Sequence, residues 1–129
     1  MKVMGNDLGV CGVEQLFHVA DVAFDTEDID DGIAVFKVPE KAIITRMVAV
    51  VEEAFNAATT NVLVVGTEDD DDAYMAAGDI TEGTTGTYTK QLFNEVAKGS
   101  EIYVKYTQTG AAATNGKASI YAFAVGIPA

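Results

Sequence analysis

Two side chains of this sequence could act together as a nucleophile and its base, and each is the only one of its type. Cys11 is the single cysteine and His18 the single histidine. A thiolate–imidazole dyad needs a third group that orients the imidazole, and no such group stands out. One cysteine and one histidine also fall short of the ligand set that zinc requires. We expect His18 to be a structural or surface residue, and we expect no catalytic residue, no cofactor and no metal ion.

Short motifs of catalytic and phosphate-binding sites are missing as well. The sequence contains no GxSxG elbow, no P-loop, no HExxH pair and no GxGxxG loop. Two carboxylates can cleave a glycosidic bond when they flank it. Glu52 and Glu53 are adjacent near the end of an expected strand, and adjacent strand residues point to opposite faces. These two carboxylates therefore cannot flank one bond, and the sequence predicts that the protein is not an enzyme.

Carboxylates are the remaining candidate ligands, and many of them gather in two runs. Residues 21–31 contain six acids and residues 68–72 contain five. Carboxylate oxygens suit Ca²⁺ or Mg²⁺, but an EF-hand loop over residues 27–38 would place Ile29 and Val38 at ligand positions. The second run is uninterrupted, so we expect its side chains to diverge. The runs are interpreted as solvated loops, and a weak divalent-ion site between them is the alternative.

The overall charge limits the classes of partner. The formal net charge is −12, from 20 acidic against 8 basic residues. Outside the two acidic runs there remain 9 acids and 8 bases, so the body of the protein is nearly neutral. Binding to nucleic acid or to an anionic membrane surface needs exposed Lys and Arg. We therefore expect neither nucleic acid nor membrane as a partner.

The residue types that must build the scaffold favour β-sheet. The chain contains 16 Val, 8 Ile and 13 Thr but only 4 Leu, and β-branched side chains suit a pleated surface. We predict an all-β fold, an antiparallel β-sandwich of seven to eight strands that is jelly-roll-like. The strand candidates are residues 13–20, 33–38, 42–55, 61–67, 86–93, 100–108 and 117–127.

Three local features of these candidates lead to finer expectations. Residues 42–55 could instead form an amphipathic helix, but their β-branched residues favour a strand with a bulge or bend. Residues 68–77 could hold a helical turn. The last two strands are expected to pair as a hairpin through Asn115-Gly116, a strong turn dipeptide. At least one of Tyr103 and Tyr121 should then lie in the core.

The chain has the length of one domain, residues 13–129, preceded by an arm of residues 1–12. No stretch approaches the roughly 20 apolar residues of a membrane-spanning helix, and the N-terminus lacks the apolar region of a secretory signal. A single cysteine excludes an internal disulfide, which fits folding in a reducing cytoplasm. The arm contains glycines and apolar residues without a clear period, and we expect Met4, Leu8 and Val10 to anchor it on a partner protein or a neighbouring subunit.

Both faces of the longest strand candidate carry apolar residues. Strict alternation places Ile43, Met47 and Val51 on one face, and a second set lies on the other: Ile44, Val48 and Val50. A sandwich buries only one face of each sheet, so some of these side chains should lie at a contact between subunits. We therefore expect a homo-oligomer.

Three stretches together resemble small structural proteins of tailed bacteriophages. Residues 34–80 combine a strand that ends in a proline, a long strand that closes on a phenylalanine, and VGT followed by an acidic loop. Residues 81–88 read TEGTTGTY, and residues 101–125 begin with EIYVKYTQTG. This arrangement, over roughly two thirds of the chain, is similar to capsid decoration proteins, which are also called cement proteins.

The resemblance implies a protein of the virion without catalytic residues. It would bind the major capsid protein on the outer surface of the capsid, and Met4, Leu8 and Val10 of the arm would contact the capsid or a neighbouring subunit. The protein would be a homo-oligomer for which a trimer is favoured, and it would fold in the host cytoplasm before assembly. The alternative is a host-attachment or carbohydrate-binding module of a tail or fibre. The absence of tryptophan counts against sugar binding, because sugars stack on aromatic rings.

Overall fold

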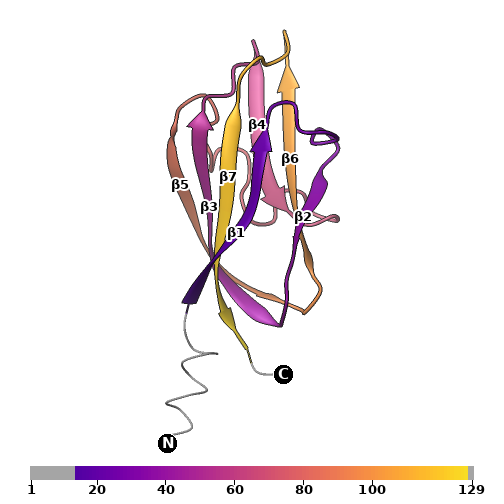
Figure 1. Cartoon of the computed structure of the whole chain (residues 1–129), viewed down its shortest axis with the longest axis vertical. Helices are drawn as coiled ribbons and strands as arrows, with labels where there is room; N and C mark the ends of the chain where they lie inside the picture. Colours follow the sequence, from indigo (N-terminus) through magenta and orange to yellow (C-terminus); the bar gives the residue numbers. More distant parts are fainter. Residues whose placement is uncertain (1–13, 128–129) are drawn as a thin grey trace, which may run out of the picture.

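Seven strands run through residues 14–127, the part of the chain that the computed structural model describes (Figure 1). Each lies within three residues of its expected ends, so the strand positions are confirmed. No helix in this range could cross a membrane. The strands are β1 (Glu14–Ala23), β2 (Ile33–Lys37), β3 (Ala42–Glu53), β4 (Thr60–Gly66), β5 (Gly86–Val96), β6 (Glu101–Thr109) and β7 (Lys117–Gly126).

The strands form two antiparallel sheets that pack face to face (Figure 1). One sheet has the order β1-β7-β3-β5 and the other the order β2-β6-β4. A single bridge between Val65 and Met75 continues the second sheet beside β4. This is the order of an eight-stranded jelly roll whose fifth strand, between β4 and β5 in the chain, is reduced to one bridge. The expected all-β, jelly-roll-like sandwich is therefore confirmed.

The expected hairpin between the last two strands is wrong. β6 lies between β2 and β4 in one sheet, whereas β7 lies between β1 and β3 in the other. Both strands are central, so their hydrogen-bonding edges are occupied by strands distant in sequence. The chain crosses from one sheet to the other between β6 and β7, and Gly116 lies on this connection. A side chain does not fit there, because a Cβ at Gly116 would lie 2.4 Å from the Phe55 ring.

Residues 68–77 form turns and the bridge to β4, so the helical turn considered for them is not present. The N–H groups of Tyr74 and Met75 both donate to the carbonyl of Val65, each at 2.9 Å. Gly66 allows this return of the chain, since a Cβ at that position would lie 2.2 Å from the carbonyl oxygen of Asp70. Tertiary contact with β4 thus decides the path of this loop.

β3 is a strand, as preferred over a helix, but a bulge reverses its alternation. The register with both neighbouring strands shifts between Ile44 and Arg46. The extra residue turns Ile44 inward together with Met47 and Val51 and leaves Ile43 half-buried on the other side. The expectation that Ile43 shares a face with Met47 is therefore wrong, because it assumed an unbroken period of two.

The core lies between the two sheets and contains large side chains from both. Tyr106, Met47 and Leu63 are at most 1% exposed. Tyr106 packs on Phe55 with ring centroids 4.8 Å apart and donates its hydroxyl proton to Asn61 Oδ1 at 2.5 Å. Tyr103 and Tyr121 are half-buried on the outer faces, so the expectation that one of them enters the core is wrong. Tyr106 takes that place.

Candidate functional site

The outer face of the four-stranded sheet carries the large side chains of β7. Along this strand Ala118, Ala122 and Ala124 are buried, whereas Tyr121 and Phe123 alternate with them and are only half-buried. Small inner residues fit because the opposite sheet supplies large ones such as Tyr106. The aromatic rings of β7 are therefore presented on the surface of the sandwich.

Cross-strand register extends this surface over all four strands. Phe123 lies opposite Leu16 of β1 and Arg46 of β3, and Tyr121 lies opposite Val48 of β3. Leu16 is 57% exposed. Together these rows line a shallow concavity of about 310 Å³, which we call the apolar hollow: Leu16, Arg46, Val48, Thr87, Thr89, Tyr121 and Phe123. Leu16 and the half-buried rings of Tyr121 and Phe123 make this concavity a candidate interaction surface.

The one positive charge in the apolar hollow is held in place from two sides. The Arg46 guanidinium lies 4.3 Å from the centre of the Phe123 ring and donates to Glu14 Oε1 at 2.5 Å. The Thr45 hydroxyl donates to the other Glu14 oxygen. These hydrogen bonds, first from Thr45 and then from Arg46, lower the pKa of Glu14. The ion pair therefore leaves the hollow electrically neutral at neutral pH.

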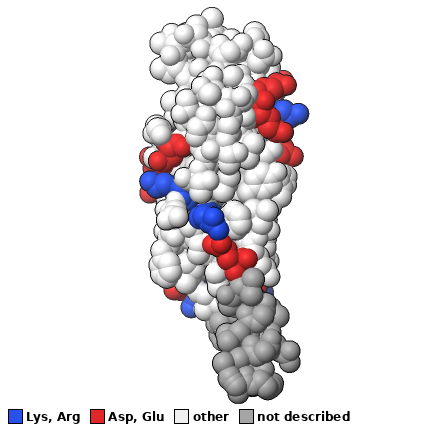
Figure 2. All heavy atoms as spheres, turned by 90° about the vertical axis from the view of Figure 1, so that its left-hand side faces the viewer, with Lys and Arg blue, Asp and Glu red and all other residues white. Residues whose placement is uncertain are grey.

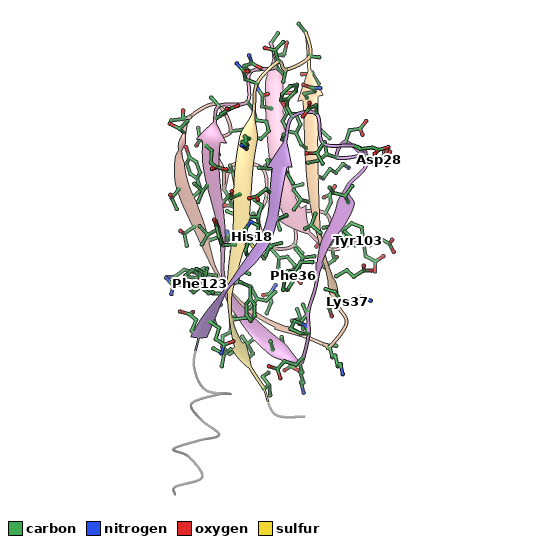
Figure 3. All side chains as sticks on the ribbon, in the orientation of Figure 1. His18, Asp28, Phe36, Lys37, Tyr103 and Phe123 are labelled. Atoms are coloured by element: carbon green, nitrogen blue, oxygen red, sulfur yellow. The ribbon has the colours of Figure 1, made fainter. Side chains whose placement is uncertain are left out.

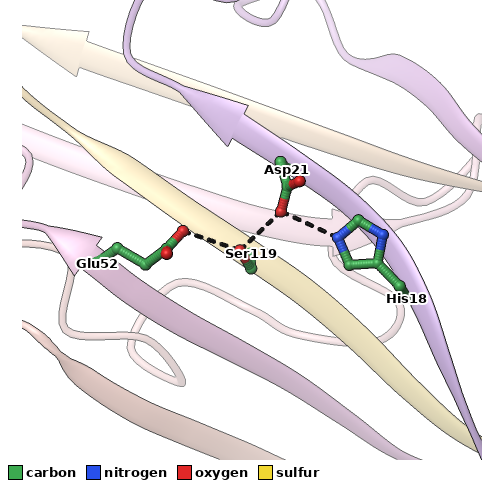
Figure 4. A network of polar contacts seen from close by, with 4 residues as sticks. All are labelled: His18, Asp21, Glu52 and Ser119. Atoms are coloured by element: carbon green, nitrogen blue, oxygen red, sulfur yellow. Dashed lines mark hydrogen bonds and ion pairs between the residues drawn. The ribbon is translucent and has the colours of Figure 1, made fainter.

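A polar network lies at the end of the same face (Figure 4). His18 Nε2 is 2.9 Å from Asp21 Oδ1, and Ser119 Oγ is 2.7 Å from that oxygen and 2.9 Å from Glu52 Oε1. The hydrogen bonds from Ser119 and then His18 lower the pKa of Asp21. The imidazole contacts the carboxylate and not the hydroxyl, so it is not placed to deprotonate Ser119. The network therefore holds two carboxylates, Asp21 and Glu52, on either side of one hydroxyl.

The two acidic runs approach each other on the outer face of the three-stranded sheet. Asp31 from the first run and Glu68 and Asp71 from the second line one hollow with Tyr103 and Lys105. Lys105 Nζ lies 3.2 Å from Asp71 Oδ2, and the Tyr103 hydroxyl donates to Glu68 Oε2 at 3.2 Å. Burial, followed by the hydrogen bond and charge of Glu68, raises the pKa of Tyr103. Lys105 thus offsets part of the negative charge of this hollow, and Tyr103 donates a hydrogen bond to one of its carboxylates.

Within the second run the expected divergence of side chains is wrong. Carboxylate oxygens of Asp70, Asp71 and Asp72 lie within 4.8 Å of one another. These residues lie in the turn that returns the chain to β4, which brings their side chains together. The expected divergence assumed an extended strand, in which successive side chains point to opposite faces. The hydrogen bond with Asp70, then burial and the charges of Asp70 and Asp71, raise the pKa of Asp72. All three side chains are exposed, so water and salt can screen their repulsion.

Charged side chains are sparse on the side of the sandwich at which β5 lies. Figure 2 shows them as separate clusters at the two margins and in the middle of the view, with uncharged surface at its upper end. Phe93 of β5 is 79% exposed, opposite the β3 bulge in a stretch where the register is interrupted. Sequence patterning did not single out Phe93 or Leu16. Their exposure depends on which edge and which face of the sheet they occupy.

The residues expected to contact a capsid or a neighbouring subunit, Met4, Leu8 and Val10, lie outside the described residues, as does Cys11. The anchoring role of the arm therefore stays a prediction, and the structure does not test a dyad of Cys11 and His18. His18 lies on the sheet surface, and half of its side chain is exposed. Its ring meets the Tyr121 ring edge to face, with the ring centroids 5.2 Å apart. That position agrees with the expected surface role of His18.

Comparison with solved structures shows which proteins share this fold. The chain is similar to a chain of the cyanophage Pam1 capsid asymmetric unit, with a TM-score of 0.67 at 18% identity over 88% of this chain and 85% of the other. It is also similar to a chain of the acidic stable capsid structure of Helicobacter pylori bacteriophage KHP30, with a TM-score of 0.63 at 14% identity over 91% and 95%. By sequence, no family model and no curated protein matches. The chain thus shares its fold, over nearly its whole length, with chains from the capsid structures of two phages.

Proposed function

We propose that this protein is a structural component of a tailed-phage virion that binds the outer surface of the capsid as a decoration protein. The observation that carries the proposal is the shared fold, which spans 85% and 95% of two chains from phage capsid structures. The sequence resemblance to decoration proteins points the same way. The polar network of His18, Asp21 and Ser119 lacks the order of a catalytic triad, which supports a role other than catalysis.

In this proposal the major capsid protein is the partner, and copies of the chain meet as a homo-oligomer for which a trimer is favoured. The apolar hollow is the surface through which copies join. Leu16 and Phe123 lose contact with water there, which is favourable in proportion to the apolar area covered. The Arg46–Glu14 pair is already formed within the subunit, so the interface does not have to neutralise an isolated charge.

The arm of residues 1–12 is the second proposed contact, with Met4, Leu8 and Val10 as its anchors on the capsid or on a neighbouring subunit. Deleting residues 2–10 should leave the sandwich folded and weaken binding to particles. Unchanged affinity of the truncated protein for bare capsids would contradict a role of the arm in attachment.

Quantifying the protein in purified virions tests the proposed function. Hundreds of copies per particle, and saturable binding to bare capsids, are expected of a decoration protein, whereas a handful of copies would indicate a tail or fibre. For the oligomer, Leu16→Asp should reduce self-association in sedimentation experiments. Thr107→Asp, on the outer face of the other sheet, is the matched control and should not. Equal sedimentation of both variants and the parent would refute the interface.

A host-attachment or carbohydrate-binding module remains the alternative because aromatic rings do lie on an outward sheet face. Two contacts count against it. Arg46 covers one side of the Phe123 ring, and His18 packs against the Tyr121 ring, so little flat ring surface is left for a sugar. Low copy number together with glycan binding that Tyr121→Ala abolishes would favour the alternative.

A further inference from the structure

An apolar hollow of a different kind opens between the two sheets, beside the start of β1. It has a free volume of about 30 Å³ and receives side chains from both sheets. Phe17 of β1 and Phe36 of β2 stand across it with ring centroids 6.0 Å apart, and Ile44 and Ile102 form its deeper wall. Figure 3 shows Phe36 between the ribbons of β1 and β2. We call this space the seam hollow.

The size and lining of the seam hollow determine which kind of group can fill it. A volume of this measure exceeds the roughly 10–15 Å³ that one water needs, yet it is small for anything beyond the end of one side chain. Gln15 and Glu40 are the polar side chains among the residues that line it. Water inside would find few hydrogen-bond partners. The occupant that gains most is therefore a single apolar side chain.

The edge of β1 beside the seam hollow is open. Among residues 14–127, β1 pairs with β7 on one side and with no strand on the other. Alternate residues of this ten-residue strand thus direct unpaired N–H and C=O groups to the open side, where another extended segment can bind them. β1 also begins at Glu14, so the chain that precedes it enters the sheet next to the hollow.

We propose that, in the free protein, residues 7–10 fold back on the open edge of their own β1 and place Leu8 in the seam hollow. A two-residue turn at Cys11-Gly12 pairs Val10 with Val13 and Leu8 with Gln15. Directly opposed residues of an antiparallel pair point to the same face. Because Gln15 lines the seam hollow, Leu8 points into it.

The residue types of this segment agree with the pairing. Leu8 and Val10 are apolar and two positions apart, so both face inward, whereas Asp7 and Gly9 face solvent. Residues 1–13 contain no proline, so every backbone N–H is available to the edge. Gly12 supplies the conformational freedom of the turn. Docking of the arm covers a strand edge that could otherwise pair with other chains before assembly.

Cross-linking of the free, full-length protein tests the register. In a Cys11→Ser background, Leu8→Cys with Gln15→Cys places two thiols at opposed positions, whose Cα atoms are about 4.5–5.5 Å apart and can form a disulfide. Asp7→Cys with Gln15→Cys is the matched control, one residue out of register. We expect an intrachain disulfide to form at least about tenfold faster in the first variant than in the control. Equal rates, or a disulfide between chains only, would overturn the proposal.

Hydrogen exchange provides a second measurement without new cysteines. The amides of residues 15–18 that face away from β7 should exchange at least about tenfold more slowly in the full chain than after deletion of residues 2–10. Identical exchange in both proteins would also overturn the proposal. Neither experiment involves a capsid, so both results are independent of whether the protein decorates one.

Discussion

The return of the acidic loop onto β4 depends on one glycine, and Gly66→Ala tests that dependence. A Cβ at Gly66 would lie 2.2 Å from the carbonyl oxygen of Asp70, 2.5 Å from the carbonyl carbon of Asp71 and 2.7 Å from the nitrogen of Ala73. Ordinary contact begins near 3.4 Å, so the loop must move by about 1 Å. All three neighbours are backbone atoms, so no change of side-chain rotamer relieves the clash.

The loss of stability follows from the packing and the hydrogen bonds that the displaced loop would lose. Overpacking of this kind costs about 1–3 kcal/mol. Displacement also strains the hydrogen bonds from Ala73 to Asp70 and from Met75 to Val65, at 3.2 and 2.9 Å, each worth about 1 kcal/mol. We expect the free energy of unfolding to fall by about 2–3 kcal/mol, which lowers the melting temperature by roughly 6–12 °C in a domain of this size.

Thermal unfolding followed by circular dichroism measures this shift. Gly83→Ala is the matched control, because a Cβ at that glycine meets no atom within 4 Å, and its stability should change by less than about 0.5 kcal/mol. If Gly66→Ala melts within about 1 °C of the parent while the protein remains folded, the loop does not pack on β4 as described. An equal loss in both variants would indicate a general sensitivity of these loops to alanine.

Three further predictions concern the core, the polar network and the acidic loop. Tyr106→Phe removes the hydrogen bond to Asn61 Oδ1 within the core and should lower the free energy of unfolding by about 1 kcal/mol in urea titrations, whereas unchanged stability would mean that the hydroxyl contributes nothing. Because hydrogen bonds from Ser119 and His18 hold the pKa of Asp21 below its ordinary value of 3.8, ionised Asp21 stabilises the fold above that pH, and this stabilisation is lost as the pH falls through the lowered pKa. Asp21→Asn should therefore lose less stability than the parent between pH 6 and pH 3, and an equal loss in denaturant melts at the two pH values would contradict the network. Calorimetric titration with Ca²⁺ should show no micromolar binding, since within residues 14–127 only three exposed carboxylates converge and a calcium site takes six to eight oxygen ligands. Tight binding that Asp70→Asn and Asp72→Asn abolish would overturn this expectation.

The positions of the seven strands could be predicted from the sequence because the signals for them are local. β-branched residues favour a pleated backbone wherever they cluster, and glycine-rich or acidic stretches separate the clusters. Residues 42–55 illustrate this, since their Val and Ile content favoured a strand over a helix of similar periodicity. The all-β sandwich follows from the number and length of the strands.

Strand partners and the direction of side chains were decided by tertiary structure. Asn115-Gly116 has the local character of a hairpin turn, yet β6 and β7 enter different sheets because each is paired with strands far away in sequence. One extra residue near Thr45 reverses the inward face of β3, and no local propensity specifies where a bulge falls. The same holds for the tyrosines, of which Tyr106 is buried and Tyr121 is not.

The candidate surface shows the same division. Its apolar residues are visible in the sequence, but alternation alone does not tell which face of a strand meets the opposite sheet. Packing decides this, since a core of fixed thickness accepts alanines on β7 only where Tyr106 and Met47 fill the space between the sheets. Phe123 and Leu16 consequently lie on the surface, and the carboxylates of Asp70 to Asp72 converge where the chain turns back to Gly66. Composition and local patterning predicted a β-sandwich with more apolar residues than its core can hold, and only the folded chain determined which of them lie on the surface.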